Sequence, residues 1–151
     1  LSLHDALPIC IKQHRPKVGE ILECDYGQFS HTCHVDGHIP PEMVKKRLVV
    51  VLNAKLNGLI LVAPISSTIN LDGIKNGYHI EIDSELIKAT SFYDKRTRWI
   101  KSELIQSVSR LRLYHIYDKG TKITQYLPRD VVTKVQRAII KAINASSLLD
   151  K

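Results

Sequence analysis

The chain has 151 residues, of which 44% are hydrophobic and 25% are charged, and its net charge at pH 7 is +7. This length suits one soluble domain, and the lack of any apolar run of about 18 residues predicts no membrane-spanning helix. The positive charge favours a polyanionic partner such as a nucleic acid, because lysine and arginine side chains displace counterions from a phosphate backbone.

The first nine residues resemble translated sequencing-adapter text, and we expect residues 1–15 to be a disordered or artefactual tail. The remaining chain, residues 16–151, is expected to form a single domain. Cysteine is sparse and odd in number, with Cys10, Cys24 and Cys33. This set argues against a disulfide framework and for a reducing cytoplasm as the location of the protein.

The first strand is predicted at Val18–Tyr26, where apolar and acidic side chains alternate, and a polar loop follows at Gly27–Pro41. Two apolar runs, Arg47–Leu56 and Leu59–Ile65, are then separated by Asn57-Gly58. Asn-Gly between apolar runs is a strong hairpin signal, because a type I′ turn requires positive φ at both central residues. The continuous apolar stretch in the first run predicts a strand that is buried on both faces.

After the hairpin, the sequence predicts a second polar loop and three more strands. The loop covers Ser66–Lys75, and the next strand, Tyr78–Ile82, alternates so that His79 faces solvent. Two further strands are predicted at Arg98–Ile105 and Val108–Ile116. Together with the first strand and the hairpin, these make about six short strands with irregular loops.

The hydrophobic period changes near the C-terminus, where a helix is predicted over residues 128–149 with Val132, Val135, Ile139 and Ile143 on one face. Pro64 is expected at the end or the edge of its strand, because proline cannot donate a backbone hydrogen bond. The pattern of short strands and one closing helix favours a mostly β fold, a small antiparallel barrel with a C-terminal helix.

The hairpin also predicts a phosphate site. Its strands run antiparallel, so Arg47 at the start of one lies near Ser66 at the end of the other. A guanidinium matches two phosphate oxygens, and a hydroxyl can bond to the same group. The alternatives are a solvated charge for Arg47 and, for Ser66, a turn hydroxyl that bonds to its own backbone. Further candidates around this site are Lys45, Lys46, Ser67, Thr68 and Lys101.

Four blocks of the sequence follow a recognisable order: Val18–Gly27, Pro41–Leu52, Leu61–Thr68 and Arg98–Leu111. They resemble, in order, the opening strand, the K-x-R-P-x-[VL]-V strand, the V-x-P-[IL]-[ST]-[ST] strand and the final strand pair of the PemK/MazF family of toxin ribonucleases. Two positions depart from the family pattern. Leu48 stands where proline is usual, and Ser66 stands where threonine is most often found.

The resemblance implies an SH3-like antiparallel β-barrel with a C-terminal α-helix, a homodimer, and a cytoplasmic toxin that an acidic antitoxin protein neutralises. It also implies metal-independent cleavage of single-stranded RNA, in which the RNA 2′-OH attacks the adjacent phosphate. Arg47 and Ser66 would be catalytic, and the surrounding lysines and hydroxyls would contact the RNA. The alternatives are a non-catalytic toxin of the same fold, of the kind that poisons DNA gyrase, and an RNA-binding module without cleavage.

A loop before the hairpin carries a rival set of side chains, His31, Cys33, His34 and His38. Their spacing matches no closed four-ligand zinc signature, so we assign no metal and no cofactor to the chain. The three histidines are instead an alternative acid–base set for RNA cleavage, because imidazole titrates near neutral pH.

Overall fold

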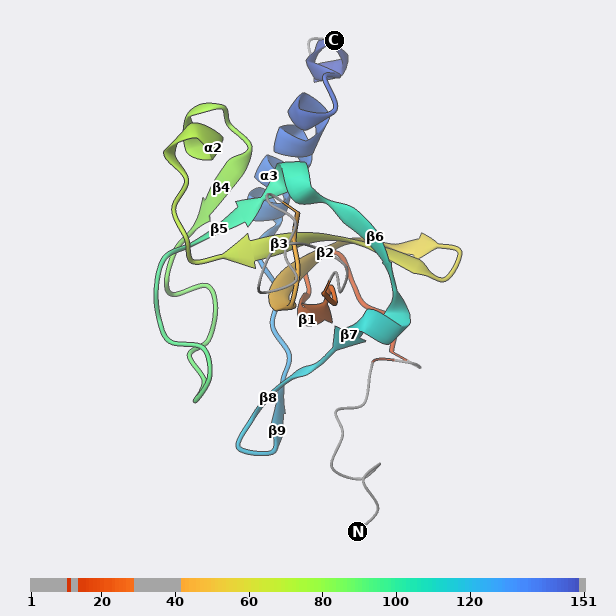
Figure 1. The fold of residues 1–151 in the computed structure, drawn as a ribbon, viewed down its shortest axis with the longest axis vertical. Coiled ribbons are helices and arrows are strands. Elements are labelled where there is room, and N and C mark those ends of the chain that lie inside the picture. The colour runs from red at the N-terminus through yellow and green to blue at the C-terminus, as the bar shows by residue number, and fades with distance from the viewer. Residues whose placement is uncertain (1–10, 12–13, 29–41, 150–151) are drawn as a thin grey trace.

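The computed structural model describes residues 11, 14–28 and 42–149 (Figure 1). The strands are β1 Ile21–Asp25, β2 Lys46–Leu56, β3 Leu59–Ser66, β4 His79–Ile82, β5 Arg98–Lys101, β6 Gln106–Ser109, β7 Leu113–Tyr114, β8 Ile116–Asp118 and β9 Thr121–Ile123. The helices are α2 Leu71–Lys75 and α3 Arg129–Ala142, with 3₁₀ turns η1 Ser102–Leu104, η2 Arg110–Arg112 and η3 Ser146–Leu149. One antiparallel sheet has the order β4-β5-β3-β2-β1-β7, with β6 also paired to β3, and β8-β9 form a separate hairpin.

The predicted hairpin is confirmed by β2 and β3, whose bounds differ from the expected ones by a single residue at each outer end. Asn57 and Gly58 connect the strands with φ values of 51° and 87°. Both values are positive, as a type I′ turn requires. The hairpin is the longest pairing in the sheet and carries the buried centre of the fold.

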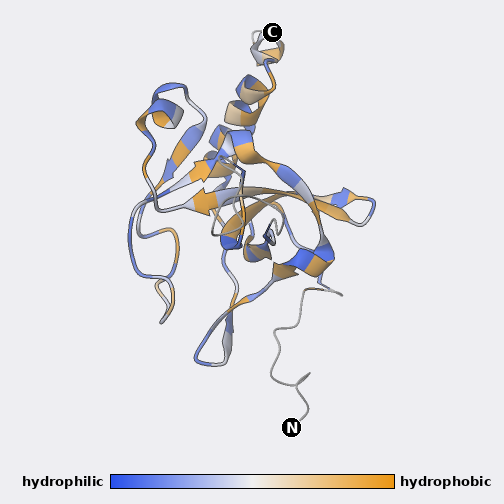
Figure 2. Ribbon diagram, in the orientation of Figure 1, coloured by the Kyte–Doolittle hydropathy of each residue, from blue (hydrophilic) through white to orange (hydrophobic). Residues whose placement is uncertain are grey.

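The centre of β2 is buried on both faces, as its continuous apolar run predicts. Val50 belongs to a cluster that includes Val132 and Val135 of α3, whereas Val49 and Val51 belong to a second cluster on the opposite face of the sheet. Successive strand residues point to opposite faces, so both clusters are built from one continuous apolar run. Figure 2 shows this hydrophobic stretch along β2 and β3.

Pro64 lies inside β3, so the expectation of a strand end or edge is wrong. β3 pairs with β6 through residues 59–62 and with β5 through residues 65–66, and Pro64 falls between these pairings, opposite η1. The backbone N–H and carbonyl of Val51 form hydrogen bonds with residues 19 and 20, on the β1 side of β2. Val49 lies two residues away, so its backbone groups point to the same side, and Val49 is the partner of Pro64. The nitrogen of Pro64 therefore faces the gap between β5 and β6, where no ladder hydrogen bond is required.

The stretch expected as a second polar loop, Ser66–Lys75, contains the short helix α2. The side chain of Asn70 caps this helix, because its Oδ1 accepts a hydrogen bond of 2.8 Å from the Gly73 N–H. His79 is buried rather than facing solvent, since α2 covers it. The two later strands are shorter than expected, because η1 and η2 interrupt them.

The C-terminal helix ends at Ala142, earlier than the expected end at residue 149. Asn144 takes a left-handed conformation with φ of 62°, and the Ala145 N–H donates to the Ile140 carbonyl at 2.9 Å. This is a Schellman ending, which stops an α-helix because the left-handed residue reverses the chain. The 3₁₀ turn η3 follows instead of a continued helix.

The mostly β antiparallel class with a C-terminal helix is confirmed, but the described strands do not close into a barrel. The sheet ends at β4 on one side and at β7 on the other. α3 packs against β4, and β7 has only two residues. The two edge strands β4 and β7 therefore do not pair with each other to close the sheet into a barrel. No helix in the described part of the chain is long and apolar enough to cross a membrane.

The fold also includes residues before position 16, where the domain was expected to begin. Ile11 is 2% exposed, and its N–H donates to the Leu113 carbonyl at 3.1 Å. Ile11 packs with the cluster on the β1 and β6 side of the sheet. This contact holds Ile11 beside β7.

Candidate active site

A groove of about 520 Å³ opens at the end of the β2–β3 hairpin where β2 begins and β3 ends. Leu48 pairs with Ile65, so the next residues outward, Arg47 and Ser66, stand side by side at the rim. The groove brings together these predicted residues: Lys46, Arg47, Ser66, Ser67, Thr68 and Lys101. The antiparallel register of one local hairpin accounts for five of the six, and β5 supplies Lys101.

Lys45 is the exception among the predicted lysines, because it does not line the groove. Its backbone is left-handed, with φ of 69°, and it is held by hydrogen bonds to both Tyr26 and Gly27. Lys46 lines the groove and lies 4.7 Å from the centre of the Tyr114 ring, within cation–π distance. The rival set of His31, His34 and His38 lies outside the described residues.

Arg47 is exposed, and one side of its guanidinium is fixed by the backbone. Its Nε donates to the Val44 carbonyl at 3.0 Å. Within the described part of the chain, Nη1 and Nη2 make no hydrogen bond. The guanidinium is therefore oriented, and among the described residues its outer pair of donors is left for an anion.

Ser66 is half-buried, and its Oγ accepts a hydrogen bond of 3.1 Å from the Thr68 N–H. This is the turn geometry that the sequence leaves open as an alternative. A hydroxyl that accepts one bond keeps its own proton for donation, so the turn also orients Ser66 as a donor at the groove. Leu48, where the family pattern has proline, is 3% exposed and packs in the core. Leu48 pairs with Glu23 of β1 and Ile65 of β3, so the sheet continues up to Arg47.

Tyr93 and Arg98 form the far wall of the groove, and no phosphate-binding role was predicted for either residue. Arg98 is 6% exposed and donates to the Asp94 carbonyl at 3.2 Å. Burial lowers the pKa of Arg98 from its ordinary value, although Asp94 opposes this shift. The Tyr93 hydroxyl donates to Glu23 at 2.8 Å, which ties this wall to β1. A buried cation next to a strand of alternating residues looks like any other charged position in a sequence.

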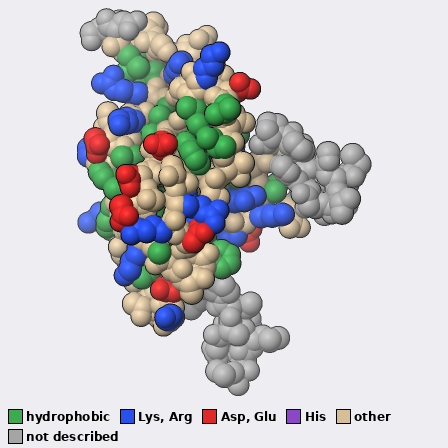
Figure 3. Space-filling view, turned by 90° about the vertical axis from the view of Figure 1, so that its left-hand side faces the viewer, with side chains coloured by type: hydrophobic (Ala, Val, Ile, Leu, Met, Phe, Trp, Pro, Cys, Tyr) green, Lys and Arg blue, Asp and Glu red, His purple; other side chains and the backbone are tan. Residues whose placement is uncertain are grey.

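The described lining of the groove is strongly cationic. Four of its side chains carry positive charge, on Lys46, Arg47, Arg98 and Lys101, and one, Glu42, is a carboxylate. Figure 3 shows lysine and arginine side chains gathered across the middle of one face of the molecule. Focused positive charge in a concave site attracts anions, and the paired donors of arginine suit phosphate oxygens.

Phe92 and Tyr93 are the aromatic side chains in the described lining of the groove. Trp99 is half-buried in β5, where it pairs with Ser66, and it does not line the groove. Phe92 does line it and is 82% exposed. An exposed ring at the rim of a cationic groove is suited to stacking on a base.

Comparison with known proteins gives one family match and two similar full-length proteins. The family of PemK-like, MazF-like toxins of type II toxin–antitoxin systems matches residues 17–143. An uncharacterised protein of Haemophilus influenzae is 99% identical over 141 residues, which is 93% of this chain and 99% of that protein. The uncharacterised protein YifN of Escherichia coli is 47% identical over 143 residues, which covers 89% of this chain and 96% of YifN.

Among solved structures, the crystal structure of MazF from Deinococcus radiodurans is similar to this chain. The TM-score is 0.55 at 13% sequence identity, and the match covers 87% of this chain and 99% of the other. At this identity the likeness concerns the fold, an antiparallel sheet followed by a helix.

Proposed function

Because this chain belongs to the family of PemK-like, MazF-like toxins of type II toxin–antitoxin systems, we propose that it is a toxin that cleaves single-stranded RNA. The observation that carries the proposal is the groove at the hairpin end, where four cationic side chains and the Ser66 hydroxyl meet. Such a lining suits a substrate with phosphate groups and provides what metal-independent cleavage needs.

In the proposed reaction, the RNA 2′-OH attacks the adjacent phosphorus. The 2′-O–P bond forms and the P–O5′ bond breaks, which leaves a 2′,3′-cyclic phosphate and a 5′-hydroxyl. Arg47 places Nη1 and Nη2 on the two non-bridging oxygens, where negative charge grows in the transition state. Ser66 donates its proton to a phosphate oxygen and fixes the orientation of the group.

Glu42 lines the same groove and is the carboxylate that can accept the 2′-OH proton. The 5′-oxygen takes a proton from water or from one of the three loop histidines, His31, His34 and His38. Lys46, Ser67, Thr68 and Lys101 hold the flanking phosphates. Lys45 lies next to this rim and adds to its positive field, since it is exposed but outside the groove lining.

The test is cleavage of a fluorescent single-stranded RNA by the purified protein in the presence of EDTA. The products should carry 2′,3′-cyclic phosphate, and a strand with 2′-deoxyribose throughout should resist cleavage. Removing one preorganised donor typically costs about 10²–10³ in turnover, so Arg47→Ala should lose that factor while keeping its fold. Arg137→Ala on the exposed face of α3 is the matched control, because it removes the same charge away from the groove.

Two outcomes would overturn the proposal. Inhibition of DNA gyrase with intact RNA would favour the non-catalytic toxin, and RNA binding without cleavage would favour a binding module. Replacing all three loop histidines with alanine separates the acid–base alternatives. Full retained activity would assign the proton transfers to the groove itself.

Membership of a type II toxin family implies an antitoxin partner and a MazF-like homodimer. We infer that the antitoxin is acidic, because the net charge of +7 and the cationic groove complement an acidic segment. Light scattering on the purified protein measures the dimer, and loss of cleavage on adding the acidic partner measures neutralisation. We propose the cytoplasm as the location of the protein, because the RNA that it is proposed to cleave is found there.

A further inference from the structure

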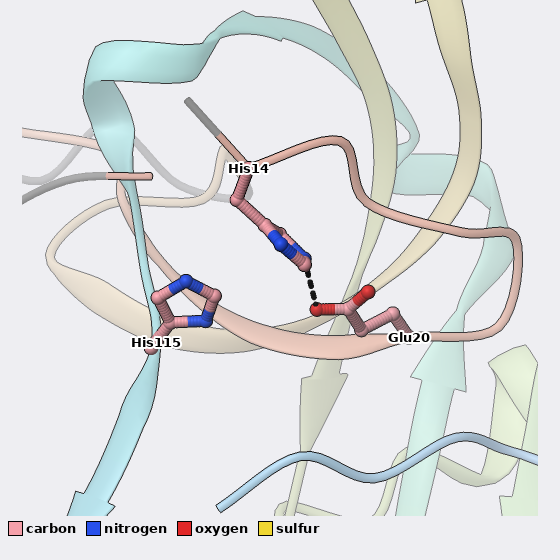
Figure 4. Close-up of side chains that lie close together, drawn as sticks. All are labelled: His14, Glu20 and His115. Atoms are coloured by element: carbon pink, nitrogen blue, oxygen red, sulfur yellow. Dashed lines mark hydrogen bonds and ion pairs between the residues drawn. The ribbon is translucent and has the colours of Figure 1, made fainter. Parts of the chain in front are cut away.

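A second cluster of functional side chains lies outside the groove and consists of His14, Glu20 and His115 (Figure 4). One nitrogen from each histidine and one carboxylate oxygen all lie within 4.8 Å of one another. His14 Nε2 and Glu20 Oε2 are 2.8 Å apart, and the two imidazole rings meet edge to face with centroids 4.7 Å apart. None of the three residues lines the RNA groove.

Three separate segments build this cluster, and each is fixed by the backbone. The N-terminal segment is held by Ile11, whose N–H bonds to Leu113 and whose carbonyl accepts from the His14 N–H at 2.9 Å. Glu20 precedes β1, and its carbonyl accepts from the Val51 N–H at 2.9 Å. His115 stands between β7 and β8. Backbone hydrogen bonds therefore hold the chain at His14 and Glu20, and the two flanking strands position His115.

The Glu20 carboxylate is buried, so a nearby positive charge would stabilise it. Its side chain is 2% exposed, whereas that of His14 is 31% exposed. Its two oxygens bond to His14 Nε2 and to the Lys17 N–H. A buried carboxylate is costly unless a positive charge offsets it. A protonated His14 would supply that charge, and so would a metal ion held between the carboxylate and the histidines.

The histidines are suited to the second possibility. A neutral imidazole offers a nitrogen lone pair, which is the form that binds a metal. Two imidazoles and one carboxylate form a ligand set that zinc commonly uses, with a fourth position for water.

We propose that His14, Glu20 and His115 bind a divalent transition-metal ion of the zinc class. Metal–ligand distances of about 2.0–2.1 Å place tetrahedral ligand atoms about 3.3 Å apart, so the cluster needs to contract by about 1.5 Å at its widest. The ion replaces the hydrogen bond between His14 and Glu20 and joins these residues to His115, between β7 and β8. Because none of the three ligands lines the groove, the ion stabilises the fold and takes no part in RNA cleavage.

The experiment titrates zinc into the full chain after removal of metals with EDTA. The background carries alanine or serine at His31, Cys33, His34 and His38, so that the loop offers no competing site. We expect one equivalent of zinc per chain and a rise in melting temperature on the order of 5 °C at about 100 times the dissociation constant. Cobalt bound in its place should give the visible spectrum of a four-coordinate ion.

Three variants test which residues hold the ion. His115→Ala should weaken binding at least about 100-fold, and Glu20→Gln should do the same while preserving the shape of the side chain. Lys122→Ala should tighten binding several-fold, because it removes a repelling charge from an exposed position of β9. Because Lys122 is exposed, Lys122→Ala should disturb folding least of the three variants, so a change in its zinc affinity cannot be attributed to unfolding.

The proposal is overturned if zinc does not bind stoichiometrically, or if His115→Ala and Lys122→Ala leave its affinity unchanged. If zinc does not change the melting temperature, the cluster is a simple ion pair between His14 and Glu20. Cleavage in EDTA is independent of these readouts, so failure of the metal site and failure of the nuclease assignment are distinguishable.

Discussion

Gly73 lies against the ring of His79 more closely than any larger residue would allow. A Cβ added at Gly73 would stand 2.4 Å from Cε1, 2.5 Å from Nδ1 and 2.6 Å from Nε2 of that ring. The ring is buried, and both oxygens of Glu103 hold its Nε2, at 2.8 and 3.0 Å. The substitution Gly73→Ala therefore requires the ring, and with it the start of β4, to move.

The size of the effect follows from these distances. Ordinary van der Waals contact begins at 3.4 Å, so the ring must retreat by about 1 Å. Overpacking of this kind costs about 1–3 kcal/mol, and weakening the bond to the partly exposed Glu103 adds about 1–2 kcal/mol. Alanine gains about 1 kcal/mol over glycine as a helix former. The net expectation is a loss of about 1–4 kcal/mol, or roughly 3–12 °C in melting temperature.

The assay is thermal and urea unfolding of Gly73→Ala in two backgrounds, the wild type and His79→Ala. In the second background the ring is absent, so Gly73→Ala should be neutral or slightly stabilising. An equal loss in both backgrounds would show that the ring contact is not the cause. An unchanged melting temperature in the wild-type background would refute the close packing itself. His79 pairs with Lys101 across β4 and β5, so activity should fall together with stability.

Three other positions give independent predictions. Asn144→Gly should leave stability unchanged or raise it, whereas Asn144→Ala should cost about 1 kcal/mol in urea unfolding, because position 144 is left-handed. Ser91 donates two hydrogen bonds to Asp118 and so lowers the pKa of that carboxyl group. The stability that these bonds give to the fold is present above the pKa of unfolded Asp118, about 3.9, and is lost as the pH falls through the lower pKa of the folded protein. Ser91→Ala should therefore raise the midpoint of Asp118 in an NMR titration, and an unmoved midpoint would contradict this. Cys24 is fully buried, and burial raises its pKa to about 12, so peptide mapping should find it unlabelled by iodoacetamide at pH 8 until the protein unfolds.

The hairpin and its rim residues could be predicted from sequence because their causes are local. Asn57-Gly58 sets the turn, the turn sets the register, and the register brings Arg47 beside Ser66. The burial of β2 follows from its continuous apolar run in the same way. None of these features depends on which distant strand becomes a neighbour.

The remaining features depend on contacts between distant segments. Arg98 becomes part of the groove only because β5 lies beside β3, and nothing near it in the sequence signals that neighbour. His79 alternates like a solvent-facing residue, but α2 covers it. The number of short strands predicts a closed barrel. Whether the two edges of the sheet meet, however, depends on the lengths of β4 and β7 and on the packing of α3 against β4, which the strand count does not show.

Pro64 has a consequence for how the chain assembles. A strand that slides along β3 by two residues keeps its apolar face but must find a new set of donors. At position 64 there is no donor on the β5 and β6 side, so residues 98–109 cannot zip continuously along β3 in a shifted alignment. Pro64 thus disfavours shifted alignments of β5 and β6 along β3, and the register that remains is the one that places Lys101 at the groove.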